Sequence, residues 1–182
     1  EALKDLLLFT SSNEKKLVSL KEYVSRMKEE QKAIYYAAGD TVEAAAMLPQ
    51  AEAAVDRGYE VLYLTDDVDE FALRVLEKYA DKEFKNVTAG ALDISTETEK
   101  AKAESANKDC EELLTFMKES IGKVSGVKFT TSLSEHPVCL TSEGELSVEM
   151  AKILKKMPGA PEGVPSANVV LEINIEHPIS AK

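Results

Sequence analysis

The feature that most constrains the fold is an alternation of strand-like and helix-like segments between residues 33 and 91. Three short runs rich in apolar and aromatic residues are typical of strands: "AIYYAA" (33–38), "YEVLYL" (59–64) and "EFKNVTA" (83–89). Helical patterns fill the two intervals, and the first is interrupted at Pro49 and ends at Gly58. Strands joined by helices pair in parallel through right-handed crossovers. The first half is therefore predicted to form a small three-layer α/β unit with a short parallel sheet.

Helix starts are marked by a polar residue followed three positions later by Glu, which is the spacing of a capping box. The first such pair predicts a helix over about residues 20–30, with Val18 and Tyr23 placed as a hydrophobic staple. The four pairs are Ser19 with Glu22, Asp40 with Glu43, Asp67 with Glu70, and Thr96 with Glu99.

The second half opens with a helical pattern over residues 97–121, whose apolar positions keep to one face from Ala103 to Ile121 before Gly122 ends it. Its first part is charged and rich in alanine, as in a linker helix, so we predict a domain boundary near residues 93–103. Strand candidates follow at 127–133, 137–142 and 169–174, with a helix after Ser147 and a loop "PGAPEGVPSAN" (158–168). This half is predicted to be an α+β domain.

Charge and hydropathy exclude several classes of partner. With 33 acidic against 22 basic residues and a net charge of −11, the surface repels phosphate backbones and anionic lipid, so neither nucleic acid nor a membrane is expected as partner. No apolar run approaches the ~20 residues of a membrane span, and the first residues lack the pattern of an export signal. Two cysteines are consistent with a reducing cytosol. Because the chain begins with Glu, we expect a piece of a longer protein.

An acidic run offers one candidate for enzyme chemistry. Asp66, Asp67 and Asp69 follow the predicted strand 59–64, at the end where open α/β sheets gather ligands, and could hold Mg²⁺ for phosphoryl transfer. The simpler interpretation is that Asp67 and Glu70 cap a helix whose N-terminus favours negative charge. No phosphate-binding loop or nucleophile accompanies the run, so the metal-dependent phosphoryl-transfer module is kept as the alternative function.

Cys139 and His136 could suggest a thiol hydrolase, since a thiolate nucleophile needs a nearby base. A spacing of three on an extended segment directs the two side chains to opposite faces, however. Cys139 is therefore predicted to be a buried or half-buried strand residue. His136 and His177 both precede proline and are predicted to lie in turns.

A stripe of apolar residues follows one face of the predicted helix after Ser147. The spacing of Leu146, Met150, Ile153, Leu154 and Met157 places them together on one face of a helix. Such a stripe is usually core. Its two methionines, which adapt to varied surfaces, and the adjoining Pro/Gly-rich loop favour a partner instead. The residues alone leave both interpretations open.

Three segments carry a resemblance to a known family: "VSLKEYVSRMKEEQKAIYYAAGD" (18–40), "GYEVLYLTDDVDEFALRVLEKY" (58–79) and "LEINIEHPI" (171–179). They resemble the heat-shock-protein-90 chaperone family, in its bacterial branch, and the likeness covers nearly the whole chain. It implies that residues 1–92 form the C-terminal part of the family's middle domain. Residues 93–106 would be the linker and the start of the long helix, and residues 107–182 a C-terminal domain lacking the final dimerisation helices.

The resemblance also implies the setting of the parent protein, a cytoplasmic homodimer that binds ATP with Mg²⁺ and hydrolyses it through a domain upstream of this chain. The fragment itself is then expected to be no enzyme, to hold no cofactor or metal, and not to dimerise by the family route. Its expected partners are unfolded or partly folded client proteins, with co-chaperones in addition.

Client-binding residues are implied in both halves. Leu146, Met150, Ile153 and Leu154 match positions on the family's amphipathic helix, which presents apolar side chains to non-native clients. Phe71 matches an aromatic client-contacting position whose usual residue is Trp, with Glu70 and Arg74 beside it. The mechanism implied is reversible burial of exposed apolar surface, kept soluble by an acidic rim.

Overall fold

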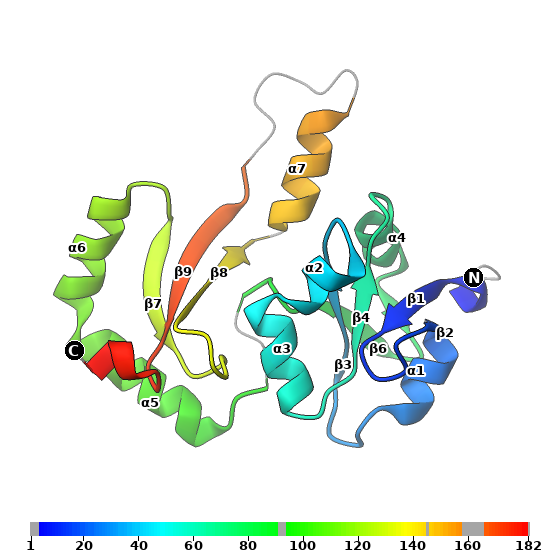
Figure 1. Cartoon of the computed structure of the whole chain (residues 1–182), viewed down its shortest axis with the longest axis horizontal. Helices are drawn as coiled ribbons and strands as arrows, with labels where there is room; N and C mark the ends of the chain where they lie inside the picture. Colours follow the sequence, from blue (N-terminus) through cyan, green and yellow to red (C-terminus); the bar gives the residue numbers. More distant parts are fainter. Residues whose placement is uncertain (1–3, 91–93, 145, 158–165, 182) are drawn as a thin grey trace. The chain divides into compact units, whose positions relative to one another are not determined.

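The structure, a computed structural model, describes residues 4–90, 94–144, 146–157 and 166–181 (Figure 1). The chain divides into two compact units, Glu1–Val87 and Thr88–Lys182. The assignment of these units to family domains stays a prediction. The loop predicted at 158–168 falls largely outside the described residues.

The first unit is built on a six-stranded sheet in the order β2-β1-β4-β3-β6-β5. The central β3 pairs in parallel with β4 and β6, whereas the β1/β2, β1/β4 and β5/β6 pairs are antiparallel. The predicted strand–helix alternation is therefore confirmed as the parallel centre of a mixed sheet, and its three-layer arrangement stays a prediction. The strands are β1 Leu8–Ser11, β2 Leu17–Ser19, β3 Ala33–Ala38, β4 Val61–Leu64, β5 Lys78–Tyr79 and β6 Lys82–Asn86.

The antiparallel edges of this sheet were not predicted. Strands β1, β2 and β5 have only four, three and two residues. Segments that short give too few positions for an alternating pattern to stand out. The sequence therefore indicated only the central strands.

A short 3₁₀ turn and four helices accompany this sheet: η1 Lys4–Leu6, α1 Leu20–Arg26, α2 Val42–Ala46, α3 Pro49–Asp56 and α4 Asp69–Leu76. The capping box of α1 is confirmed, because the Glu22 N–H donates to Ser19 Oγ at 3.3 Å and the Ser19 N–H donates to Glu22 Oε2 at 2.8 Å. The helix ends at Arg26, shorter than expected. Gly58 follows α3 with φ +75°, a left-handed conformation that glycine adopts without strain.

Two predicted helix caps are wrong. Helix α2 is capped by Thr41, whose Oγ1 accepts the Ala44 N–H at 3.1 Å, and not by Asp40. Helix α4 begins after Val68 without a side-chain cap, so the box expected from Asp67 and Glu70 does not form. The reason is that the Glu70 carboxylate is used inside the unit, as described below.

The core of the first unit joins α1 and α4 to the sheet. Leu20 and Tyr23 of α1 and Leu73 of α4 are buried in one cluster with Ile34 of β3 and Leu62 of β4. The hydroxyl of Tyr23 donates to the Glu60 carbonyl at 2.6 Å and accepts the Tyr35 N–H at 3.1 Å, which fixes α1 to β3 and to the residue before β4. Because Leu73 belongs to this same buried cluster, α4 is held against the sheet together with α1.

The second unit holds a three-stranded sheet in the order β7-β9-β8. Strand β7 Gly126–Thr130 is parallel to β9 Asn168–Asn174, and β8 Val138–Glu143 is antiparallel to it. All three predicted strands are confirmed, although the first ends at Thr130. The remaining elements of this unit include α7 Val148–Lys156 and the 3₁₀ turn η2 Pro178–Ala181.

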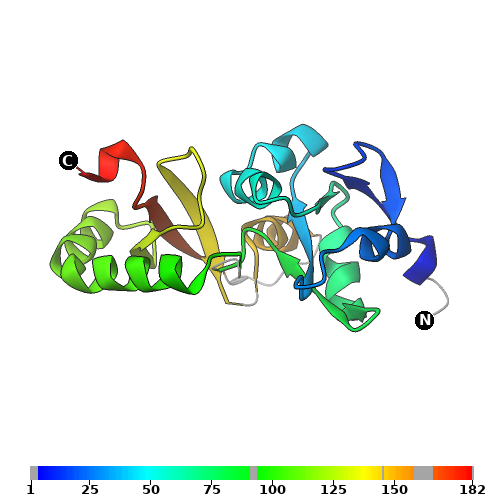
Figure 2. The same cartoon turned by 90° about the horizontal axis from the view of Figure 1, so that it is seen from below.

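The long helix predicted over 97–121 is two helices, α5 Glu97–Asp109 and α6 Glu111–Ile121, which follow the β7 side of the sheet (Figure 2). They meet at Cys110, whose φ of −112° and ψ of 20° interrupt the helical backbone. The Thr96 capping box and the left-handed Gly122 at the end are confirmed. The single apolar face is not continuous, because Leu114 is buried while Leu113 is 50% exposed.

Candidate functional site

Helix α7 is positioned by its first turn. Ser147 Oγ accepts the Met150 N–H at 3.0 Å, as its place before the helix predicts. Glu149 lies in the first turn and Lys155 in the last, which suits the helix dipole at both ends. Lys152 forms an ion pair with Glu149 at 2.6 Å on the polar side of the helix. The helix is therefore well formed. Its polar residues lie off the apolar stripe of Leu146, Met150, Ile153, Leu154 and Met157, which we call the α7 stripe.

Exposure along the α7 stripe rises from the start of the helix to its end. Met150 is only 4% exposed, and the neighbouring Ala151 is buried as well. Ile153 and Leu154, one turn further on, are half-buried. Met157, which ends the helix, is 46% exposed. The stripe is thus closed at its first turn and accessible at its last, and Leu146 before the helix is half-buried.

The other predicted site residues lie together on α4 in the first unit. Glu70 is 3% exposed, and its Oε1 accepts hydrogen bonds from Asn86 Nδ2 at 2.6 Å and the Tyr36 hydroxyl at 3.3 Å. Burial raises the pKa of Tyr36, and the Glu70 charge raises it further. Glu70 therefore connects α4 to β3 and β6. Phe71 is half-buried and Arg74 is exposed, so these two side chains are the more accessible ones.

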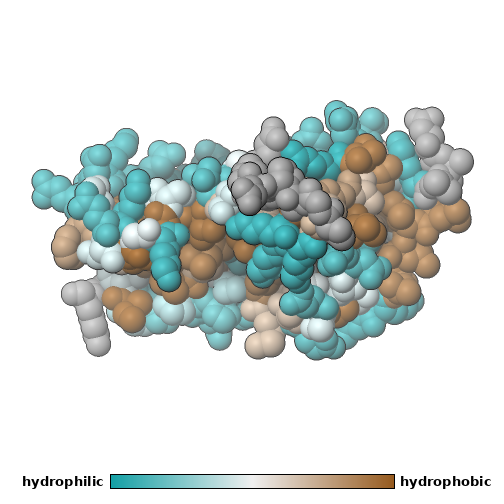
Figure 3. All heavy atoms as spheres, turned by 90° about the horizontal axis from the view of Figure 1, so that it is seen from above, coloured by the Kyte–Doolittle hydropathy of each residue, from teal (hydrophilic) through white to brown (hydrophobic). Residues whose placement is uncertain are grey.

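An apolar groove of about 530 Å³ adjoins Phe71. Val68, just before α4, and Val75 on α4 are 67% and 85% exposed, and Leu7 and Lys4 also line the groove. Figure 3 shows hydrophobic residues gathered at the right-hand end of its view, the end at which Figure 1 draws β1 and α4. The groove was not predicted, because its residues come from two segments more than sixty positions apart.

The acidic run after β4 gives no support to phosphoryl transfer. Asp66 and Asp67 are exposed, and Asp69 Oδ2 accepts the Asp66 N–H at 3.2 Å. Burial raises the pKa of Asp69, which opposes the ionised form that a metal needs. Among the residues that the structure describes, no group of three or more His, Cys, Asp or Glu side chains is arranged to hold a metal ion. The acidic run instead forms the loop between β4 and α4, where the Asp69 carboxylate bonds the main chain of Asp66.

Cys139 is a buried strand residue, as predicted, with 6% exposure on β8. Burial, and next the charge of Glu172, raise the pKa of its thiol to about 12. A thiol with that pKa supplies almost no thiolate at neutral pH, which excludes it as a nucleophile.

A buried ion pair on the same sheet was missed by sequence reasoning. Glu172 of β9 is 2% exposed, and its Oε1 lies 3.2 Å from Lys128 Nζ and accepts from Thr141 Oγ1 at 3.1 Å. Burial favours the neutral form of Lys128, but the carboxylates of Glu172 and Glu143 outweigh it and raise the pKa of the ammonium. The available signal was that Glu172 lies two residues after the apolar Val170, so the two side chains share one face of the strand.

Comparison with known proteins identifies the class of protein to which these two units belong. The sequence model described as "Hsp90 protein" matches residues 1–182, the whole chain, and the chain therefore belongs to the Hsp90 family. Bacterial chaperone proteins are among its relatives. The chain is 53% identical over 179 residues to the chaperone protein HtpG of Clostridium acetobutylicum and 49% identical over 180 residues to that of Bacillus subtilis.

These matches cover 97% and 98% of this chain but 28% of each relative. The chaperone protein HtpG of Clostridium perfringens is 52% identical, again over 98% of this chain and 28% of the relative. The chain thus spans about a quarter of the length of the relatives it matches. Within the described residues, no helix is both long enough and apolar enough to cross a membrane.

Proposed function

We propose that this chain is the client-facing part of a cytoplasmic, ATP-driven chaperone. Residues 1–92 are the end of the middle domain, residues 93–106 the linker and the start of the long helix, and residues 107–182 most of the C-terminal domain. ATP with Mg²⁺ is bound and hydrolysed upstream of this chain, and the dimer forms through helices that follow it. The partners are unfolded or partly folded proteins, with co-chaperones in addition. The 49–53% identity to proteins named chaperone protein HtpG supports this proposal.

The observation that carries the proposal is the graded exposure of the α7 stripe. Met150 is anchored in the structure, while Ile153, Leu154 and Met157 keep apolar surface within reach of a partner. Complete burial of one such side chain contributes about 1.5–3 kcal/mol, so a few half-exposed ones supply about 2–4 kcal/mol. Even before the entropic cost of association, that corresponds to a dissociation constant of about 1–30 mM. Binding of this strength is readily reversed, as the release of clients requires.

A second contact surface on α4 adds to the first. Phe71 and Arg74 are its accessible residues, and Glu70 holds the helix in place through Asn86 and Tyr36. Two weak surfaces that engage one client chain bind more strongly than either alone, because the second contact becomes intramolecular. We therefore propose that Leu146, Met150, Ile153, Leu154, Phe71, Glu70 and Arg74 form or support the client-binding surfaces.

The test is a pair of matched double variants of the complete chaperone. Leu154→Lys with Met157→Lys adds two charges at the accessible end of the α7 stripe. Ser105→Lys with Ser120→Lys adds the same charges at exposed helix positions away from it. We expect the α7 variant to suppress the aggregation of heat-denatured citrate synthase severalfold less well, measured by light scattering, while the control matches the parent.

Unfolding temperatures of both variants are measured by circular dichroism. Equal suppression by the α7 variant and the control would remove the α7 stripe from the client surface. If the α7 variant unfolds and the control variant does not, the stripe belongs to the core.

A further inference from the structure

Two residues of β7 present main-chain groups at its outer edge. Within the described residues, the groups of Phe129 are paired with a side chain, and those of Val127 are open. The Thr130 carbonyl accepts the Ile175 N–H at 3.0 Å, so Thr130 directs its carbonyl toward β9. Main-chain groups alternate along a strand, and those of Phe129 and Val127 therefore point to the opposite side, away from β9. Helices α5 and α6 both contact β7, and Asn107 of α5 reaches this outer edge.

Asn107 of α5 fills one position of this edge. Its Oδ1 accepts the Phe129 N–H at 2.7 Å and its Nδ2 donates to the Phe129 carbonyl at 3.1 Å. These are the two hydrogen bonds that a residue of a neighbouring strand would make. The carboxamide thus stands in for a peptide group and shows that this edge accepts a planar amide.

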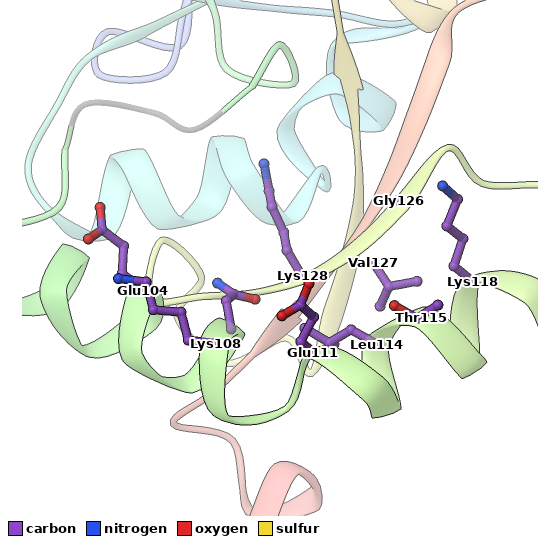
Figure 4. A pocket seen from close by; sticks show the side chains of 10 residues that line it. Glu104, Lys108, Glu111, Leu114, Thr115, Lys118, Gly126, Val127 and Lys128 are labelled. Carbon is purple, nitrogen blue, oxygen red and sulfur yellow. The ribbon is translucent and has the colours of Figure 1, made fainter.

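Val127, two residues earlier, presents the same donor and acceptor without such a substitute. In the part of the chain that the structure describes, no side chain or loop pairs with the outward main-chain groups of Val127. Beside them lies a groove of about 550 Å³ between β7 and the two helices, which we call the β7 groove (Figure 4). Its size is that of ordinary small-ligand and peptide sites.

The lining of the β7 groove suits a polypeptide backbone with small apolar side chains. Leu114 of α6 is 7% exposed and forms an apolar floor, next to Thr115. Lys108 and Glu111 add charges of both signs on the helix side, so no strongly charged ligand is favoured. The groove is lined by residues of α5, α6 and β7, so an extended segment bound in it would lie along β7.

We propose that the β7 groove binds an extended segment of a non-native polypeptide by strand addition, with one of its residues exchanging two hydrogen bonds with Val127. The identity of this ligand rests on the proposed chaperone function, but the site is separate from the α7 stripe and from α4. Main-chain pairing is independent of sequence, whereas the apolar surfaces select side chains. The two modes together let one chaperone hold chains of varied composition.

The experiment titrates the 182-residue chain with the capped peptide acetyl-Thr-Val-Thr-amide, whose three residues pair along Val127 without reaching the Phe129 position that Asn107 fills, and follows backbone amide signals by ¹H–¹⁵N NMR. We expect the Val127 amide signal to move downfield with saturation. N-methylation of the peptide's central residue removes its N–H, and the loss of one hydrogen bond should weaken binding about tenfold. Thr115→Trp, which fills the groove, should abolish the shift, and the matched variant Ser120→Trp, outside the groove, should leave it unchanged.

Three outcomes overturn the proposal. The first is a Val127 amide signal that does not shift when peptide is added, because the β7 groove would then not bind it. If the amides of residues 150–157 shift in the same titration, the client role proposed for α7 is unaffected. The second is binding that N-methylation does not affect, since it would come from side chains alone. The third is a Val127 shift that depends on protein concentration without peptide, because the edge would then pair with a second copy of the chain.

Discussion

Replacement of Met150 by Ala removes the most buried apolar side chain of the α7 stripe. With 4% exposure, Met150 loses both its transfer free energy and the space it fills. Truncations of this kind cost about 2–5 kcal/mol, and we expect about 2–3 kcal/mol because α7 stands near the surface and can relax. The Ser147 cap remains, since it bonds the main chain of Met150. Met157→Ala is the matched control: at 46% exposure it should cost less than about 1 kcal/mol.

The measurement is urea denaturation of both variants, followed through NMR signals of β8 and β9 so that the second unit is observed by itself. A clear difference between the two methionines would establish that the stripe is anchored at one end and accessible at the other. Equal losses of stability would refute this reasoning, whether both were large, as in a closed core, or both negligible, as on a wholly exposed helix.

Three further results are expected. Glu70→Ala should cost about 1–3 kcal/mol of unfolding free energy, because it leaves the buried Asn86 amide without its 2.6 Å acceptor, whereas Glu70→Gln should cost less; urea denaturation of the first unit distinguishes them. The rise in the pKa of Cys139 from 9.0 to about 12 lowers its thiolate fraction about a thousandfold, so mass spectrometry should show far slower alkylation by iodoacetamide in the folded chain than in concentrated urea. The unfolded thiol ionises first, so this contribution to stability is present below about pH 9 and lost as the pH rises toward 12; a Cys139→Ala variant that shows the same pH dependence would contradict this. Ser19→Ala should cost about 1 kcal/mol through the loss of the α1 cap, measured by thermal unfolding.

The family resemblance and the central strands were both available from the sequence. Strand β3 begins and ends where its apolar run does, and the helix after Ser147 starts at its predicted cap. Such features are local: a strand needs a run of suitable residues, and a cap needs two residues three positions apart. The candidate residues on α7 and α4 came from the resemblance, because spacing alone does not distinguish a core stripe from a binding surface.

Two of the wrong predictions share a physical cause. Glu70 has the spacing of a capping residue, but its carboxylate instead accepts hydrogen bonds in the interior from a buried amide on β6 and a hydroxyl on β3. Cys110 lies on a continuous helical pattern, yet the helix breaks there and both halves lie against β7. In each case a partner distant in sequence competes with a local preference worth about 1 kcal/mol and wins.

Sequence alone thus determined which segments become strands and helices, the acidic surface and the family, because these depend on composition and on neighbours a few residues away. Tertiary structure decided how far each residue of the α7 stripe is covered, which carboxylates are buried, and that Val127 keeps an open edge beside a groove. Those properties depend on which segments, distant in sequence, pack against a given side chain or main-chain group. Hydrophobic periodicity reflects only neighbours a few residues away and does not indicate which distant segments make contact.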